Sequence, residues 1–174
     1  ITGGYPTGGG TQYIATNTTI LDGEDSYRVL KYDVDANQTI EGLTIQNGFS
    51  NNDYGGAGIL IKNAISVRTF NLKKVKLLNN QITSGEGGAI FSIDHLIFET
   101  CEINNNNANN GGGGVHALSN ITATDTKFTN NSGALGGGLH VIKDATLMDV
   151  LVANNSATDY GGGIYVLEKM TLTN

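Results

Sequence analysis

A repeat of about 25 residues is the feature that most limits how this chain can fold. In each copy a run of small residues ends at an aliphatic residue, and an Asn follows the last apolar pair of the copy. The aliphatic landmarks are Ile59, Ile90, Val115, Leu139 and Ile164, and the asparagine landmarks are Asn47, Asn79, Asn105, Asn130 and Asn154. The aliphatic landmarks are 31, 25, 24 and 25 positions apart and the asparagines 32, 26, 25 and 24. Two independent ladders with nearly the same spacing indicate a solenoid.

Short segments within each period alternate apolar and polar residues, which is typical of β-strands with one buried face. One copy has the inner pairs Ile90 and Ser92, Leu96 and Phe98, and Cys101 and Ile103. A single coil cannot bury its inner face, so successive coils have to stack. The sequence predicts an all-β, right-handed parallel β-helix with three short strands per coil, and the handedness follows from the rule for parallel crossovers. Leucine-rich repeats have a similar period, but no helical periodicity is present here.

Glycine and asparagine are predicted to form the turns between strands. Glycine lets the backbone turn sharply. Asparagine tolerates the left-handed conformation, and stacked Asn amides can hydrogen-bond along the axis. The structural candidates are Asn79, Asn105, Asn130, Asn154, Gly88, Gly113, Gly137 and Gly162. Disordered linkers are the alternative, but linkers do not keep a regular period.

Length and composition indicate one folded domain. The chain has 174 residues, 39% of them hydrophobic. We expect a single β-helix domain over 1–174, with irregular coils over 1–54 and regular coils of 24–31 residues over 55–174. The net charge of −6 argues against nucleic acid as a partner. No apolar stretch reaches the roughly 18 residues that a membrane-spanning helix needs.

Two short motifs resemble a known repeat family. The segments GGAI at 87–90 and FTNN at 128–131 are similar to the paired GGA[ILV] and FxxN repeats of polymorphic outer-membrane proteins. Residues 1–23 and 41–48 look like segments that accompany such repeats. The copies at 112–115 and 161–164 depart from the pattern, with Gly where Ala is usual. The resemblance implies a pectin-lyase-like β-helix that is secreted or displayed at the bacterial outer membrane, with adhesion as the usual role.

The same resemblance implies that any membrane attachment uses a separate anchor or barrel. Leu172 and Asn174 lie 25 positions after Leu147 and Asp149, before the next Asn turn is due. We therefore expect this chain to be part of a longer protein.

Polysaccharide lyases and hydrolases share this fold, and they need carboxylates on neighbouring coils. The fourth position after each aliphatic landmark aligns Asn63, Asp94, Ser119, Lys143 and Glu168, and the fifth aligns Ala64, His95, Asn120, Asp144 and Lys169. Neither ladder places two carboxylates side by side. The other acidic groups, Asp33 with Asp35 and Asp22 with Glu24 and Asp25, are predicted to be solvated turns. No catalytic residue is predicted, and a pectate-lyase-type module remains the alternative.

An outward ladder follows the aliphatic landmarks and supplies the candidate binding residues. It runs through Leu60, and its candidates are Phe91, His116, His140 and Tyr165. On coils about 4.8 Å apart these side chains would form an exposed strip for contact with sugar or protein. The alternatives are plain stacking along the sheet or packing under a loop. His116 and His140 supply two metal ligands without a third in register, so no metal and no cofactor is predicted.

Two further positions have structural interpretations. A second outward ladder of Lys76, Glu102, Lys127 and Leu151 alternates in charge, which stabilises adjacent strands. Cys101 falls on the inner face and is predicted to be a buried, unreactive thiol. We expect a non-catalytic, adhesin-like β-helix whose partner is a host or cell-surface protein or a glycan. A structural stalk is a further alternative.

Overall fold

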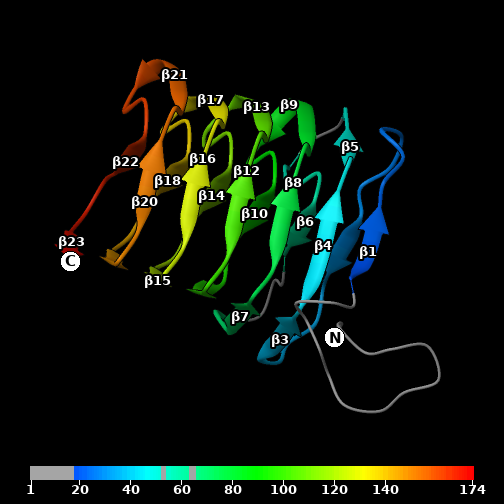
Figure 1. The fold of residues 1–174 in the computed structure, drawn as a ribbon, viewed down its shortest axis with the longest axis horizontal. Helices are drawn as coiled ribbons and strands as arrows, with labels where there is room; N and C mark the ends of the chain where they lie inside the picture. Colours follow the sequence, from blue (N-terminus) through cyan, green and yellow to red (C-terminus); the bar gives the residue numbers. More distant parts are fainter. Residues whose placement is uncertain (1–17, 52–53, 63–65) are drawn as a thin grey trace.

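The chain winds as a stack of β-coils in the computed structural model, which describes residues 18–51, 54–62 and 66–174 (Figure 1). Strands of successive coils pair in parallel and form four sheets along the axis. Sheet 1 contains β1 (Thr19–Asp22), β4 (Leu43–Gln46), β8 (Lys76–Leu78), β12 (Glu102–Asn104), β16 (Lys127–Thr129) and β20 (Leu151–Ala153). Sheet 2 contains β2 (Leu30–Tyr32), β6 (Ile59–Ile61), β10 (Ile90–Ser92), β14 (Val115–Ala117), β18 (Leu139–Val141) and β22 (Ile164–Val166).

The other two sheets complete each coil. Sheet 3 contains β3 (Gln38–Glu41), β7 (Thr69–Lys73), β11 (His95–Glu99), β15 (Ile121–Thr124), β19 (Ala145–Met148) and β23 (Met170–Thr173). Sheet 4 contains β5 (Phe49–Ser50), β9 (Gln81–Glu86), β13 (Asn107–Asn110), β17 (Ser132–Leu135) and β21 (Ser156–Tyr160). No helix long and apolar enough to cross a membrane occurs in the described part of the chain.

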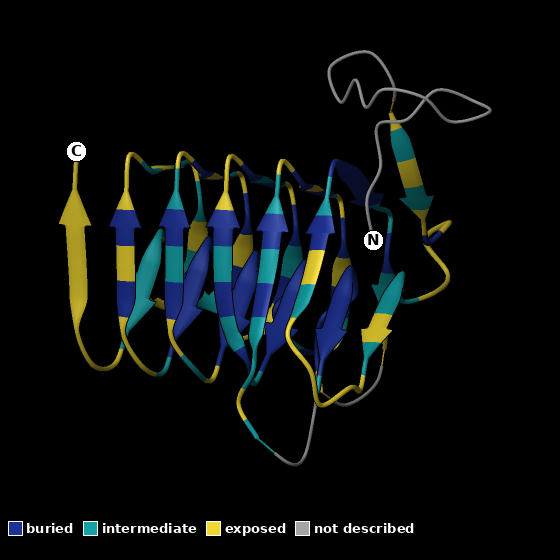
Figure 2. Ribbon diagram, turned by 90° about the horizontal axis from the view of Figure 1, so that it is seen from below, coloured by how far each residue is buried: buried dark blue, intermediate teal, exposed yellow. Residues whose placement is uncertain are grey.

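The register along sheet 2 confirms the predicted parallel β-solenoid. Ile59, Ile90, Val115, Leu139 and Ile164 pair in one continuous file, and Leu30 of β2 extends it by one coil. The four landmarks from Ile59 to Leu139 have no solvent-exposed surface. The strands that face the viewer in Figure 2 alternate between buried and more exposed residues along their length. The inner face of each coil therefore contributes to one continuous core.

The prediction of three strands per coil is wrong, because sheet 4 adds a fourth short strand after each Asn turn. The segments that form it are polar, such as Asn-Ala-Asn-Asn in β13, and they bury little. Ala108 of β13 packs inward with Ile82 and Ala57 in a small cluster apart from the main core. The pairing of β13 with β9 is also interrupted by a register shift between Ala108 and Asn110. A short polar strand with a bulge lacks the alternation that predicts a strand.

Asparagines support the turns between sheet 1 and sheet 4 in two ways. Asn79, Asn105, Asn130 and Asn154 have φ between 55 and 57°, in the left-handed region. The residues that follow them point inward and form a ladder: Asn80 Nδ2 donates to Asn106 Oδ1 at 2.9 Å, Asn106 Nδ2 to Asn131 Oδ1 at 3.0 Å, and Asn131 Nδ2 to Asn155 Oδ1 at 2.9 Å. The expected amide ladder is thus present, and it runs through the second Asn of each pair.

Cys101 lies in the core, as the sequence predicts. The residue is 3% exposed, and its Sγ lies 3.2 Å from the carbonyl oxygen of Leu72. Burial raises the pKa of the Cys101 thiol to about 11. The reactive thiolate is therefore scarce, and reagents cannot reach it in the folded protein.

We predict that Cys101 resists thiol reagents until the protein unfolds. A rise in pKa from 9.0 to about 11 lowers the thiolate fraction about a hundredfold at pH 8, before any steric protection is counted. The measurement is the rate at which a chromogenic disulfide labels Cys101 at pH 8. The rate is compared between native buffer and a urea concentration that unfolds the protein. Rapid labelling without denaturant would contradict the buried position.

Candidate functional site

The candidate binding strip on sheet 2 is in register but is not exposed. Phe91, His116 and His140 are 5%, 2% and 3% exposed, and only Tyr165, on the last coil, is half-buried. Phe91 stacks on His116 at 5.5 Å, and His140 lies 5.2 Å from Tyr165, measured between ring centroids. The expectation of a solvent-accessible strip is therefore wrong for Phe91, His116 and His140.

The physical reason is that the segments leading out of sheet 4 fold over the outer face of sheet 2. A Cβ atom built on Gly55 would lie 2.9 Å from Cβ of Phe91, and one on Gly111 would lie 2.6 Å from Nδ1 of His116. Backbone at these glycines thus rests directly on the aromatic column. The strip is a second, outer layer of packing, which matches the alternative of packing under a loop.

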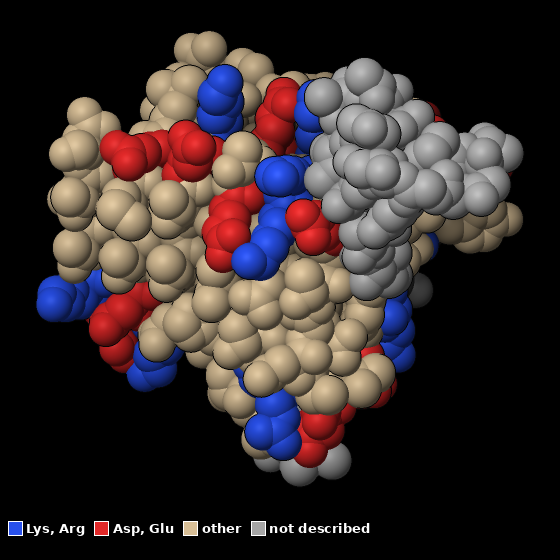
Figure 3. All heavy atoms as spheres, turned by 60° about the horizontal axis from the view of Figure 1, so that its bottom comes forward, with Lys and Arg blue, Asp and Glu red and all other residues tan. Residues whose placement is uncertain are grey.

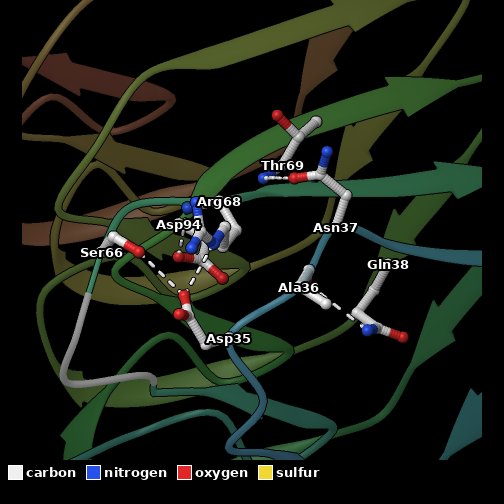
Figure 4. Close-up of polar contacts among 8 residues, drawn as sticks. All are labelled: Asp35, Ala36, Asn37, Gln38, Ser66, Arg68, Thr69 and Asp94. Carbon is white, nitrogen blue, oxygen red and sulfur yellow. Dashed lines mark hydrogen bonds and ion pairs between the residues drawn. The ribbon is translucent and has the colours of Figure 1, made fainter.

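Two acidic groups lie on either side of an arginine at the corner between sheet 2 and sheet 3 (Figure 4). Asp35, Arg68 and Asp94 occupy this corner on three successive coils. Asp35 Oδ1 accepts hydrogen bonds from Arg68 Nε at 2.7 Å and from Ser66 Oγ at 2.8 Å. Asp94 is 3% exposed, and its Oδ1 accepts a hydrogen bond from the backbone N–H of Arg68 at 2.9 Å. The hydrogen bond that Arg68 donates to Asp35 is the largest cause of a raised pKa of Arg68.

This corner corrects the alignment expected from spacing alone. The register pairs His95 with Thr69, so Arg68 and not Asn63 is the neighbour of Asp94. The coil between Ile59 and Ile90 is longer than those that follow, and its extra residues precede Arg68. Asn63 and Ala64 lie outside the described residues. The Arg68 guanidinium engages Asp35 and the Arg68 backbone N–H engages Asp94, an arrangement that does not suit an acid–base pair or a Ca²⁺ site.

The other acidic clusters are also engaged in local contacts. The Asp22 carboxylate accepts hydrogen bonds from Gln46 Nε2 at 2.7 Å and from the backbone N–H of Glu24 at 2.8 Å. These bonds, the one from Gln46 first, lower the pKa of Asp22. Asp33 Oδ2 lies 3.6 Å from Lys31 Nζ at an exposed position. Both clusters behave as turns, and no group of three or more His, Cys, Asp or Glu in the described ranges could hold a metal ion.

Charged residues on the outer faces form paired ladders. The register of sheet 1 aligns Lys76, Glu102, Lys127 and Leu151, as the sequence predicts. Lys76 Nζ lies 3.4 Å from Glu102, and on sheet 3 Lys73 Nζ lies 3.0 Å from Glu99. Both pairs are partly exposed, so each contributes at most about 1 kcal/mol. They favour the stacking of adjacent coils.

One outer surface was not singled out from the sequence. The outward positions of β15, β19 and β23 hold Thr122, Thr124, Thr146, Met148, Thr171 and Thr173. We call this surface the threonine face. It is uncharged, it lies at the C-terminal end of sheet 3, and its residues are half-buried or exposed. Figure 3 shows it as a largely tan area, while mixed acidic and basic side chains gather toward the middle of the molecule. The repeated Thr at alternate positions of ITAT, ATLM and MTLT was the signal that could have revealed it.

Comparisons with known proteins agree with the fold. A family model described as a right-handed β-helix region matches residues 7–174. This match bears out the predicted handedness. No curated protein and no solved structure matches the chain.

Proposed function

Because the chain belongs to the right-handed β-helix family, we propose that it is a non-catalytic binding β-helix, adhesin-like, secreted or displayed at the bacterial surface, and that its partner is a glycan. The threonine face is the single observation that carries the choice of partner. Its hydroxyl and methyl groups are fixed on a rigid sheet, at a repeat of about 4.8 Å between coils and about 6.6 Å along each strand.

An uncharged array of this kind suits an uncharged, hydroxyl-rich polymer. Thr hydroxyls donate and accept hydrogen bonds, and their methyl groups pack on the C–H surfaces of sugar rings. Nucleic acid and acidic polysaccharides would need clustered Lys or Arg, whereas the cations described above lie beside carboxylates. The resemblance of GGAI and FTNN to polymorphic outer-membrane repeats supports display at the cell surface.

The paired state of the acidic groups supports a non-catalytic role. At the corner between sheet 2 and sheet 3, the Asp35 carboxylate pairs with the Arg68 guanidinium, and the Asp94 carboxylate accepts a hydrogen bond from the Arg68 backbone N–H. Lyases and hydrolases of this fold class use carboxylates that are free to bind Ca²⁺ or to transfer protons.

We predict that the protein binds neutral glycans and that Thr146→Lys weakens this binding by about tenfold or more, because a desolvated, unpaired ammonium costs well over 1.4 kcal/mol. Thr146 lies at the centre of the threonine face and is exposed. The measurement is binding to an array of neutral and acidic glycans and to insoluble neutral polysaccharides.

The matched control is Thr158→Lys, which makes the same change at an exposed position of sheet 4 and should leave binding unchanged. An array on which neutral glycans stay blank, or equal losses for the two variants, would remove the threonine face as the binding surface. Sustained cleavage of an acidic polysaccharide, with or without Ca²⁺, that is lost in Asp35→Asn would contradict the non-catalytic role.

A further inference from the structure

The side chains of His116 and His140 form a buried pair outside the main core. Both residues are at least 97% buried, and their ring centroids are 4.4 Å apart at an interplanar angle of 79°. None of the four ring nitrogens has a hydrogen-bond partner in the described part of the chain. Buried polar atoms without partners are rare and are costly to keep, so this pair invites a functional explanation.

The surroundings of the pair are mostly unable to carry charge. Phe91 of β10 stacks on His116, and the backbone at Gly111, which follows β13, closes over Nδ1 of the same ring. On the C-terminal side, Tyr165 of β22 contacts His140, and Tyr160 of β21 stacks on Tyr165 at 5.8 Å. The two tyrosines are the titratable groups that β21 and β22 add to the column.

Glu86 of β9 is the acidic group in contact with the pair. Its Oε2 lies 3.2 Å from Nε2 of His116, without the geometry of a hydrogen bond. Burial raises the pKa of Glu86, while burial, and then the neighbouring His140, lower the pKa of His116 to about 3. Both shifts have burial as their largest cause, so the cost of desolvating the charges outweighs the attraction between Glu86 and a protonated His116 in the closed structure.

We propose that His116 and His140 form an acid-sensitive latch, in which proton uptake by the imidazoles releases the turns after β9 and β13 from the outer face of sheet 2. An imidazolium at either position would lie in a layer that is apolar apart from the half-buried Glu86, and a second imidazolium would lie 4.4 Å away. The charged rings can reach water only if the covering backbone at Gly111 moves aside. The main core lies on the other face of sheet 2, and its residues do not include this pair, so the release is local.

The direction of the pH dependence follows from proton linkage. The pKa of His116 is lowered in the closed form and returns toward 6.5 in the open form, so the open form binds the proton. Closure is therefore fully favoured above pH 6.5 and is lost as the pH falls toward 3. Relative to pH 7, His116 alone raises the opening equilibrium about 25-fold at pH 5. Burial also lowers the pKa of His140, which acts in the same direction, whereas Glu86 opposes it.

Hydrogen exchange of the whole chain tests the latch. We expect amides of residues 82–87 and 107–113 to exchange about 25-fold or more faster at pH 5 than at pH 7, after correction for intrinsic exchange rates. Amides of sheet 1 should keep their protection. The double variant His116→Phe/His140→Phe extends the aromatic column of Phe91 and should abolish the response, and His95→Gln, at the one remaining histidine, should preserve it.

Two outcomes would overturn the latch. One is equal corrected exchange at pH 5 and pH 7 in the unmodified protein, and the other is an unchanged response in the double variant. If the double variant does not fold, the imidazole signals of the unmodified protein decide by NMR. Titration of His116 and His140 near 6.5 with full amide protection would show that both rings ionise without any opening.

Discussion

Gly113→Ala is expected to destabilise the fold by about 3 kcal/mol or more, although it adds a single methyl group. A Cβ atom at this position would lie 2.1 Å from the carbonyl oxygen and 2.2 Å from the carbonyl carbon of Ser132. It would also lie 2.6 Å from the carbonyl oxygen of Gly137. These are backbone atoms of the next coil, and they cannot move aside without breaking the pairing between coils. Urea denaturation followed by circular dichroism measures the loss.

The control is Gly162→Ala, at the same position of the last coil. A Cβ there would meet only the carbonyl oxygen of Asn155 at 3.7 Å, an ordinary contact. We expect a change within about 0.5 kcal/mol. Neither glycine has a positive φ, so backbone strain does not separate the two variants. Equal losses of stability in the two variants would show that contact with the next coil is not what requires glycine at position 113.

The core columns were predictable because two signals coincide in the sequence. The period fixes which residues stack, and the alternation fixes which of them point inward. Ile90, Val115 and Leu139 satisfy both rules, and they are fully buried neighbours along sheet 2. Where the period varies, as in the longer coil before Ile90, spacing alone misassigned the neighbour of Asp94.

The burial of the histidine column was not predictable from the same rules. Alternation shows that His116 and His140 point away from the core of their own coils, but it does not show what covers them from outside. The cover comes from sheet 4, whose strands are short, polar and interrupted by bulges. Its residues pack through backbone at positions such as Gly111, and glycine leaves no hydrophobic pattern in the sequence.

The candidate site was predictable only in part, for a related reason. The two ladders read from the sequence place no carboxylates side by side, and at the corner between sheet 2 and sheet 3 the structure places Arg68 beside both Asp35 and Asp94. The threonine face is formed by six residues from three coils. Only the strand register of sheet 3 shows that they lie side by side. Outer positions also carry no burial signal, so their grouping has to be read from the sheet.

Asn106→Leu is expected to destabilise the protein by about 3–5 kcal/mol, although leucine has a similar size and is more hydrophobic. The Asn106 Oδ1 accepts hydrogen bonds from the backbone N–H and the side-chain amide of Asn80, both at 2.9 Å. Its Nδ2 donates to the carbonyl oxygen of Leu77 at 3.0 Å and to Asn131 Oδ1 at 3.0 Å. Leucine would leave these groups buried and unpaired on both neighbouring coils, at about 1–3 kcal/mol for each group that finds no new partner.

Asn109→Leu provides the control for this change on the same coil. Asn109 is exposed and makes one hydrogen bond, from Nδ2 to the carbonyl oxygen of Thr83 at 2.7 Å, so a loss of at most about 1 kcal/mol is expected. A double variant that also carries Asn80→Leu should lose less than the sum of its single losses, because each single change already orphans the other's partner. Additive losses from Asn80→Leu and Asn106→Leu would mean that the amides act as separate turn residues and that no ladder couples the coils.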